Sequence, residues 1–350
     1  MEETQNVRAL PAAEGDSVEP IALSVDVGAR RFAAFLICLA LLVAAFAVTA
    51  LFVRRDTDGL SGKLHGLFHG ETAEEGGSSD GREPSPKNPE SLPEGATPVI
   101  NRDLSYLELG ESYLHNETPY TPDLSVLLER ALPRLSATDA PQILILHTHT
   151  SESYQEGEPS YLAGSPGDTT YSRDADRSVI AVGKALAETL QEKGITVIHC
   201  TVMHDAPTLG GSYERSAEAV KKYVEQYPTI VLVIDLHRDA ILNASGEYIR
   251  PQGSASSAAQ VMAVVGSDCN GTRHERWEEN LALAVQLRAK LNQTTPDLCR
   301  PVSLRNASYN QELAPYYLLL EIGSGASSVK EACASAVLVG QGLAELLQER

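Results

Sequence analysis

The sequence has no cluster of basic residues. Nowhere do more than two Lys or Arg residues stand side by side, and 28 basic residues are outnumbered by 47 Asp and Glu residues. The formal net charge is therefore −19 at pH 7. Because a nucleic-acid backbone is bound through patches of Lys and Arg, we expect no nucleic-acid partner.

The sequence also lacks the short motifs of several common enzyme classes. No H-E-x-x-H, G-x-S-x-G or P-loop motif occurs, which disfavours zincins, serine hydrolases and P-loop nucleoside triphosphatases. None of the five cysteines stands in a C-x-x-C pair, so a zinc knuckle held by thiolates is not supported. Cys269 and Cys299 could pair outside the cell, and the alternative is that they are unpaired, partly buried small residues.

Charged residues are absent from the segment 32–53. A helix of this length spans about 33 Å, enough to cross the hydrocarbon core of a membrane. The competing interpretation is a signal peptide cleaved near Ala45-Phe46-Ala47. Against it, the acidic tail over 1–31 is long, and the apolar run exceeds a normal signal core. We expect one uncleaved transmembrane helix, whose orientation the balanced flanking arginines do not decide.

Residues 54–100 differ in character from the rest of the chain. They contain E-E-G-G-S-S at 74–79 and P-S-P at 84–86. Such a segment cannot bury enough apolar surface to offset the entropy lost on ordering it. We therefore expect a flexible linker over 54–100, then a lead-in segment over 101–140 and a folded domain over 141–350.

From residue 141 onward, short apolar runs alternate with helical patterns. The expected strands cover 143–146, 195–200, 230–235, 261–265 and 318–320. The expected helices cover 179–191, 216–226 and 280–291, with a last helix from Ser328, where Ser328 and Glu331 have capping-box spacing. This alternation predicts an α/β fold, with a mainly parallel central sheet and helices on both faces.

Polar side chains follow three of the expected strands. His147 and His149 follow the first, His237 follows the third, and Glu321 comes directly after the last. Ligands of open α/β sheets bind at the carboxyl ends of the strands, so these side chains should meet at one edge. Each residue alone is more often structural, and it is their joint position that indicates a metal site.

The H-x-H spacing at 147–149 also occurs in two other kinds of metal enzyme. A metallo-β-lactamase-like site would need Asp and His where this chain has Ser151 and Glu152. An amidohydrolase barrel needs roughly 250 residues, more than the segment 141–350 provides. Neither class explains the pattern.

Four motifs, in the same order, resemble the stage II sporulation protein P family. They are I-L-I-L-H-T-H-T-S-E-S-Y at 143–154, V-I-D-L-H-R-D-A at 233–240, Y-N-Q-E-L at 309–313 and L-L-E-I-G-S at 319–324. The resemblance covers residues 141–350 and the layout of anchor and linker. It implies a cell-wall hydrolase of endospore-forming bacteria, related in fold to the zinc-dependent N-acetylmuramoyl-L-alanine amidases.

The resemblance also implies an activity, a location and partners. Such proteins cut stem peptides from the glycan strands of peptidoglycan, and this branch is associated with cutting peptide cross-links as well. They sit in the mother-cell membrane, with the catalytic domain outside the cytoplasm, in the space between the membranes during engulfment. Their usual partners are a lytic transglycosylase and a further sporulation membrane protein.

By motif position, the resemblance implies two ligands for Zn²⁺ and a catalytic carboxylate. His149 matches the first zinc ligand, with His147 as the fallback or as a group behind the ligands, and His237 matches the second. Glu321 matches the catalytic carboxylate, which would take a proton from water and pass it to the leaving amine.

The third zinc ligand of the amidases is a Glu at the start of the first helix, and here the chain departs from the pattern. Asp176 lies nearest that place in the sequence, and Glu152 is the other candidate. The missing helix Glu favours a rival interpretation, a non-catalytic wall-binding or scaffold protein. We expect Arg238, Asn310 and Gln311 to hold the peptide, with a purely local structural role as the alternative.

Overall fold

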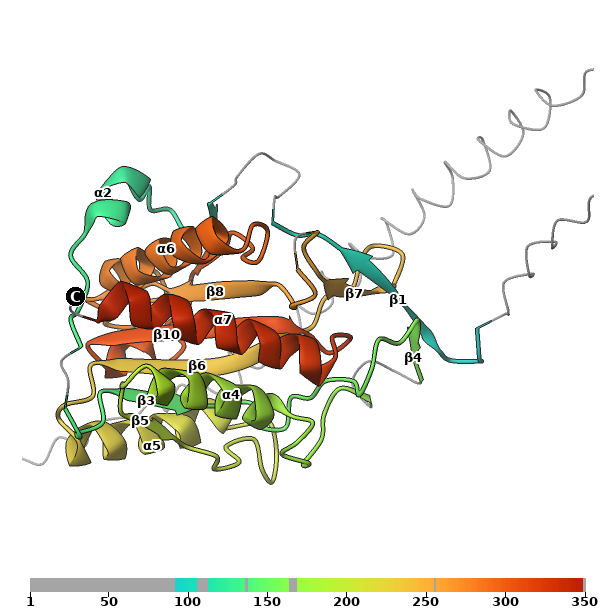
Figure 1. The fold of residues 1–350 in the computed structure, drawn as a ribbon, viewed down its shortest axis with the longest axis horizontal. Helices are drawn as coiled ribbons and strands as arrows, with labels where there is room; N and C mark the ends of the chain where they lie inside the picture. The colour runs from blue at the N-terminus through green and yellow to red at the C-terminus, as the bar shows by residue number, and fades with distance from the viewer. Residues whose placement is uncertain (1–91, 106–112, 136–137, 164–168, 255, 349–350) are drawn as a thin grey trace, which may run out of the picture. The chain divides into compact units, whose positions relative to one another are not determined.

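The computed structural model of the chain describes residues 92–105, 113–135, 138–163, 169–254 and 256–348 (Figure 1). The tail predicted over 1–31, the anchor predicted over 32–53 and most of the predicted linker lie outside these residues. Among the described residues, no helix is long and apolar enough to cross a membrane.

A seven-stranded sheet forms the centre of the fold. Its strands, in spatial order, are β2 (Leu114–Asn116), β9 (Val302–Arg305), β8 (Val261–Gly266), β10 (Tyr316–Ser324), β6 (Leu232–Asp239), β3 (Ile143–Leu146) and β5 (Val197–His199). Neighbours run parallel within each half of the sheet and antiparallel where β10 meets β8. The sheet is thus mixed, and the prediction of a mainly parallel sheet was wrong.

The reversal at β8 has a physical cause in the connection that precedes it. Among the described residues between β6 and β8, the short strand β7 (Tyr248–Pro251) is the one regular element, and none of these residues is helical. A parallel return needs a long crossover, usually a helix, whereas a chain that turns straight back runs antiparallel. The sequence pattern marked β8 as a buried strand but carried no signal for its direction.

Helices cover both faces of the sheet, as predicted. On one face lie α4 (Val179–Glu192), α6 (Trp277–Thr294) and α7 (Val329–Leu347), which Figure 1 shows in front of the strands. On the other lies α5 (Ser212–Gln226). Strand β3 shows how alternation divides the core: Ile143 and Ile145 pack with α4, whereas Leu144 and Leu146 pack with α5.

The helix ends follow local capping chemistry. The side chain of Ser178 caps α4, and Gly194, with a φ of 79°, follows its last turn. The predicted capping box of α7 is confirmed, since the Ser328 and Glu331 side chains each bond the backbone N–H of the other residue. Helix α5 begins at Ser212, four residues before the predicted start.

The folded part begins earlier than we predicted. Strand β1 (Thr97–Arg102) starts inside the predicted linker and joins a second sheet of order β4–β1–β7, in which β4 covers Tyr161–Leu162. It pairs with β7 in parallel and with β4 antiparallel. The lead-in segment holds β2 and the short helix α2 (Leu124–Glu129), which packs against α6.

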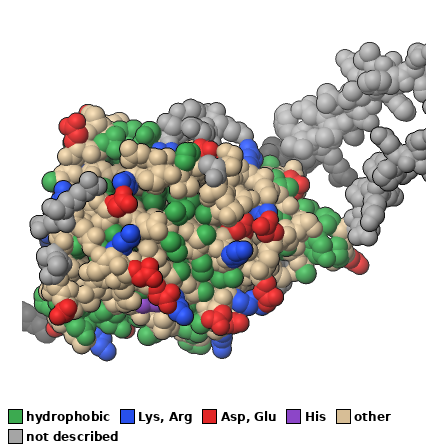
Figure 2. All heavy atoms as spheres, in the orientation of Figure 1, with side chains coloured by type: hydrophobic (Ala, Val, Ile, Leu, Met, Phe, Trp, Pro, Cys, Tyr) green, Lys and Arg blue, Asp and Glu red, His purple; other side chains and the backbone are tan. Residues whose placement is uncertain are grey.

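Two further predictions concern cysteines and surface charge. Cys269 and Cys299 are both free thiols, so they do not pair. On the face drawn in Figure 2, Lys and Arg side chains are scattered among acidic ones and form no continuous stripe.

Candidate metal centre

Three adjacent strands bring the predicted site residues together. Strand β6 lies between β3 and β10, and Glu321 of β10 stands directly opposite His237 of β6. His149 lies in the turn that follows β3, and Glu152 comes directly after this turn. The carboxyl ends of these parallel strands therefore form one edge, as the sequence pattern predicted.

His149, Glu152 and His237 form the group of described residues that could hold a metal ion, with one ligand atom of each within 4.8 Å of the others. The distance from Glu152 Oε1 to His149 Nδ1 is 3.4 Å, and from Glu152 Oε2 to His237 Nδ1 it is 3.3 Å. Tetrahedral zinc, with bonds of about 2.0–2.1 Å, separates its ligand atoms by roughly 3.3 Å. The residues present therefore fit zinc in number and type, and the two distances from Glu152 to the imidazoles match the spacing of zinc ligands.

Asp235 lies behind one of these imidazoles, that of His237. Its Oδ1 lies 3.1 Å from Nε2 of His237, on the side of the ring away from Glu152. Asp235 is itself fixed, because its two oxygens accept the backbone N–H of Thr148 at 2.8 Å and the hydroxyl of Thr148 at 2.6 Å. A carboxylate in this position is the usual support of a histidine that binds zinc.

Burial and charge set the protonation of the two glutamates in opposite directions. Burial alone would raise the pKa of Glu152, but the charge of His237 and hydrogen bonds from His149 and His237 outweigh it and lower that pKa. Burial raises the pKa of Glu321 to about 8, and the nearby Asp239 adds to the effect. Oε2 of Glu321 is buried and has no hydrogen-bond partner among the described residues. Glu152 is thus held as an anion, and Glu321 can carry a proton near neutral pH.

The two alternative ligands lie outside this group. His147 is fully buried, with Nδ1 at 3.0 Å from the Leu236 carbonyl and Nε2 at 2.9 Å from Nε2 of His199. Both of its ring nitrogens are used within the core, and burial lowers its pKa to about 3. Asp176 is exposed, in the loop before α4, and does not belong to the metal-capable group.

The three residues predicted to hold substrate lie in different surroundings. Arg238 lines the pocket beside the metal-capable group, but its Nη2 donates to the carbonyl and the hydroxyl of Thr170. Asn310 donates to the Tyr213 carbonyl at 2.8 Å. Gln311 is fully buried and joins its amide to the backbone of β8, which is the local structural role named as the alternative.

The pocket around the metal-capable group has a volume of about 260 Å³. It is also lined by residues that sequence reasoning missed: Tyr171, Tyr213, Asp239, Arg305 and Tyr309. One further omission, Asp235, had a visible signal. It stands two positions before His237 in the same strand, and residues two apart share a face of a sheet.

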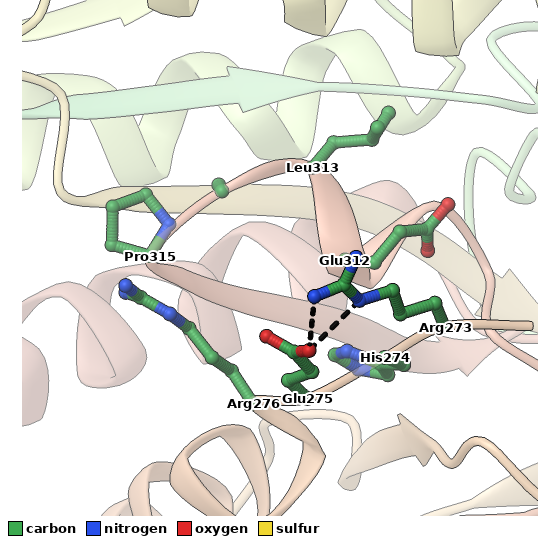
Figure 3. A pocket seen from close by; sticks show the side chains of 8 residues that line it. Arg273, His274, Glu275, Arg276, Glu312, Leu313 and Pro315 are labelled. Carbon is green, nitrogen blue, oxygen red and sulfur yellow. Dashed lines mark hydrogen bonds and ion pairs between the residues drawn. The ribbon is translucent and has the colours of Figure 1, made fainter.

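Another pocket lies at the opposite end of β10, next to Ala314 and Pro315 (Figure 3). Its charged groups include Arg273 and Glu275, which are joined to each other in an exposed ion pair. Of the described residues that line it, none belongs to the metal-capable group. The described residues that could hold a metal ion thus line the pocket with His149, Glu152 and His237.

With this geometry in place, comparison with known proteins identifies the family. The family model of stage II sporulation protein P (SpoIIP) matches residues 73–344. The chain belongs to the stage II sporulation protein P family. The resemblance seen in the four sequence motifs is thereby confirmed. The stage II sporulation protein P of Bacillus subtilis (strain 168) is 26% identical over 210 residues, which cover 57% of this chain and 49% of that protein. The chain thus spans about half the length of the curated relative it matches.

The chain is also similar to solved structures of three amidases, two of which are named N-acetylmuramoyl-L-alanine amidases. Ami1 from Mycobacterium abscessus, in its apo form, is 15% identical and has a TM-score of 0.35, with 59% of this chain and 99% of that one covered. The CwlV catalytic domain from Bacillus (Paenibacillus) polymyxa var. colistinus is 13% identical, with a TM-score of 0.32 and coverages of 58% and 94%. CwlD from Clostridioides difficile, solved in complex with the GerS lipoprotein, is 15% identical, with a TM-score of 0.34 and coverages of 58% and 98%.

Proposed function

We propose that this chain is a zinc-dependent peptidoglycan hydrolase that cleaves the amide between N-acetylmuramic acid and L-alanine, with peptide cross-links as a further substrate. The observation that carries the proposal is the metal-capable group of two imidazoles and one carboxylate, with the unpaired carboxylate of Glu321 in the same pocket. Membership of a sporulation family supports a role in septal wall remodelling and engulfment.

His149, Glu152 and His237 would hold the zinc ion, and three protein ligands leave a fourth position open, as in catalytic zinc sites. Zinc in such a site acts as a Lewis acid that polarises the scissile carbonyl and makes water more acidic. Asp235, whose Oδ1 lies 3.1 Å from Nε2 of His237, would keep Nδ1 of the same ring turned toward Glu152.

Glu321 is the residue that would move the proton. It stands opposite His237 across the β6–β10 pair, at the wall of the pocket, and it is not a member of the metal-capable group. As a carboxylate it would accept a proton from the attacking water and then donate it to the leaving amine. A cation bound beside it would lower its raised pKa, which favours the proton-accepting form at the start of the reaction.

The location and the partners are part of the same proposal. We place the chain in the cell membrane through a single helix over 32–53, with residues 141–350 outside the cytoplasm, facing the peptidoglycan between the membranes of the sporangium. A lytic transglycosylase and a further sporulation membrane protein are the proposed partners.

One observation favours a second candidate function. Helix α4 has no acidic residue in its first turn, where the amidases carry their third ligand. If Glu152 does not replace that ligand, the same fold would bind or organise the wall without cutting it.

Product analysis separates the two functions. The purified full-length chain is incubated with isolated peptidoglycan, and the soluble products are identified by mass spectrometry. The hydrolase releases stem peptides that begin with free L-alanine, loses this activity with a zinc chelator, and regains it when Zn²⁺ is added back. Binding to the wall with no released peptide under any of these conditions would support the scaffold.

A further inference from the structure

Two arginines line the pocket, and they differ in how far their guanidinium donors are already used within the protein. Arg238 is buried, donates to Thr170, and lies over the ring of Tyr171 at 4.8 Å. The side chain of Arg305, in contrast, is 39% exposed. Its Nε donates to Ser303 Oγ at 2.9 Å. Arg305 therefore keeps guanidinium donors for a ligand, whereas Arg238 serves mainly to hold the pocket wall.

The surroundings of Arg305 keep it charged. Burial opposes the charged form, but Tyr309, Glu117 and Asp239 outweigh burial and raise the pKa of Arg305. Of these carboxylates, Glu117 forms an ion pair with Arg305. Its side chain is 47% exposed, and its Oε1 lies 4.0 Å from Nε of Arg305. This ion pair is long and solvated, so it leaves the cation largely unneutralised.

Tyr309 stands next to Arg305 in an unusual backbone conformation. Tyr309 and Asn310 both have positive φ, 53° and 61°. Left-handed backbone is uncommon outside glycine, and for a bulky residue such as Tyr it persists only where the surroundings enforce it. Tyr309 lies close enough to Arg305 to help raise the pKa of its guanidinium, and both residues line the pocket.

The residues that follow Tyr309 supply that enforcement. Asn310 donates from Nδ2 to the Tyr213 carbonyl at 2.8 Å and to Ser216 Oγ at 3.1 Å, which ties the loop to α5. Gln311 accepts the N–H of Gly266 at 2.8 Å and donates to the Val264 carbonyl at 2.9 Å, which ties it to β8. Two consecutive side chains thus fix the loop while the one before them faces the pocket.

Gly266 shows how closely this loop is pressed against the sheet. A Cβ atom at Gly266 would stand 2.1 Å from the Ala307 carbonyl oxygen, so any larger residue would push the loop away. The backbone of residues 307–308 can therefore pack against the end of β8 only over a glycine.

We propose that Arg305 and Tyr309 form a subsite that binds the free α-carboxylate of the D-glutamate residue of the stem peptide, close to the scissile amide. The inference rests on the proposed hydrolase function and names the part of the substrate that this side of the pocket recognises. The other pocket wall carries Glu152, Asp239 and Glu321, so an incoming carboxylate needs a cation on its own side. Arg is suited to that task, because its planar guanidinium can donate two parallel hydrogen bonds to one carboxylate.

The test is a binding comparison in the full-length Glu321→Gln chain, which does not consume the ligand. The probes are N-acetylmuramoyl-L-alanyl-D-glutamate, with a free α-carboxylate, and N-acetylmuramoyl-L-alanyl-D-isoglutamine, in which that group is an amide. We expect the acid to bind roughly 10- to 100-fold more tightly, as the loss of a charged hydrogen bond predicts. Adding Arg305→Gln should abolish this preference, and Tyr309→Phe should reduce it.

Arg273→Gln is the matched control, because Arg273 is an exposed arginine of the other pocket, and it should leave the preference unchanged. Equal affinity for acid and amide in the parent chain would overturn the proposal, and so would a preference that survives Arg305→Gln. Hydrolysis of the wall is measured separately with native Glu321. A carboxylate preference without hydrolysis would refute the proposed enzyme and leave the subsite standing.

Discussion

The two walls of the pocket hold their side chains by different means. The strand wall, made of His149, Glu152, His237 and Glu321, comes from the ends of regular strands and the turn after β3. The loop wall is made of Tyr213 from α5, Arg305 at the end of β9, and Tyr309 from a left-handed loop that is tied to α5 and to β8. The first wall gathers imidazoles and carboxylates, and the second gathers phenols and a guanidinium.

This difference separates two tasks. The hydrogen bonds between neighbouring strands fix the position of each residue along the strand. This rigidity suits a metal-capable group, whose ligand atoms must stay about as far apart as the 3.3 Å between Glu152 and His237. A loop held by side-chain hydrogen bonds can change in shape and sequence without disturbing the sheet. Changes in the strand wall should therefore abolish chemistry, and changes in the loop wall should alter the affinity for substrate.

The largest effect is expected at Glu152, the residue that bridges the two imidazoles. Glu152→Gln keeps the shape but removes the negative charge that a zinc ligand supplies. Stoichiometric zinc, measured by elemental analysis of the purified chain, should be lost together with hydrolysis. Asp176→Asn is the matched control and should keep both. If zinc is lost from the Asp176 variant alone, Asp176 is the third ligand.

A slightly smaller effect is expected at Glu321. Glu321→Gln preserves size but cannot accept a proton, so turnover should fall by on the order of 10²–10⁴, the usual contribution of a positioned acid–base group. Zinc content and binding to intact wall should stay nearly unchanged. Near-normal turnover would make Glu321 a structural carboxylate, whereas lost zinc would make it a ligand.

The support behind the strand wall should matter less than the ligands themselves. Asp235→Asn weakens the orientation of His237, and residues in such positions typically contribute 10- to 100-fold to metal affinity. Zinc affinity, measured by competition with a chelator of known strength, is expected to fall by that amount. The melting temperature of the metal-free chain is the control, since Asp235 also accepts two hydrogen bonds from Thr148. Unchanged zinc affinity would remove Asp235 from the site.

The smallest effect is expected in the loop wall. Asn310→Gly tolerates the φ of 61° but loses the hydrogen bonds to Tyr213 and Ser216. The loss of such a hydrogen bond corresponds to roughly a fivefold change in affinity. We therefore expect KM to rise by about this factor, with kcat and zinc content unchanged. A loss of zinc in this variant would mean that the two walls are not independent.

The same contrast explains what could be predicted from the sequence. His149, His237 and Glu321 follow apolar runs that mark buried strands, and the carboxyl ends of such strands meet, so their meeting was predictable. Glu152 stayed ambiguous, because only the fold of the turn at 148–151 brings it back between the two imidazoles. The direction of β8 and the strand β1 inside the predicted linker had no periodic signal.

The loop wall was missed for a related reason. Asn310 and Gln311 look like substrate contacts in the sequence because they are polar and stand in a family motif. In the structure their side chains hold the loop, and the residue before them lines the pocket. No local pattern distinguishes a polar residue that binds substrate from one that positions its neighbour, because the difference depends on contacts with α5 and β8.

The most direct test of the central claim is the zinc content of the full-length chain with and without His237. The account predicts one zinc per native chain, and loss of both zinc and stem-peptide release in His237→Ala. His115→Ala, which changes a half-exposed histidine outside the pocket, should retain both. A native chain that releases stem peptides without zinc, or a His237→Ala chain that still binds one zinc, would contradict the account.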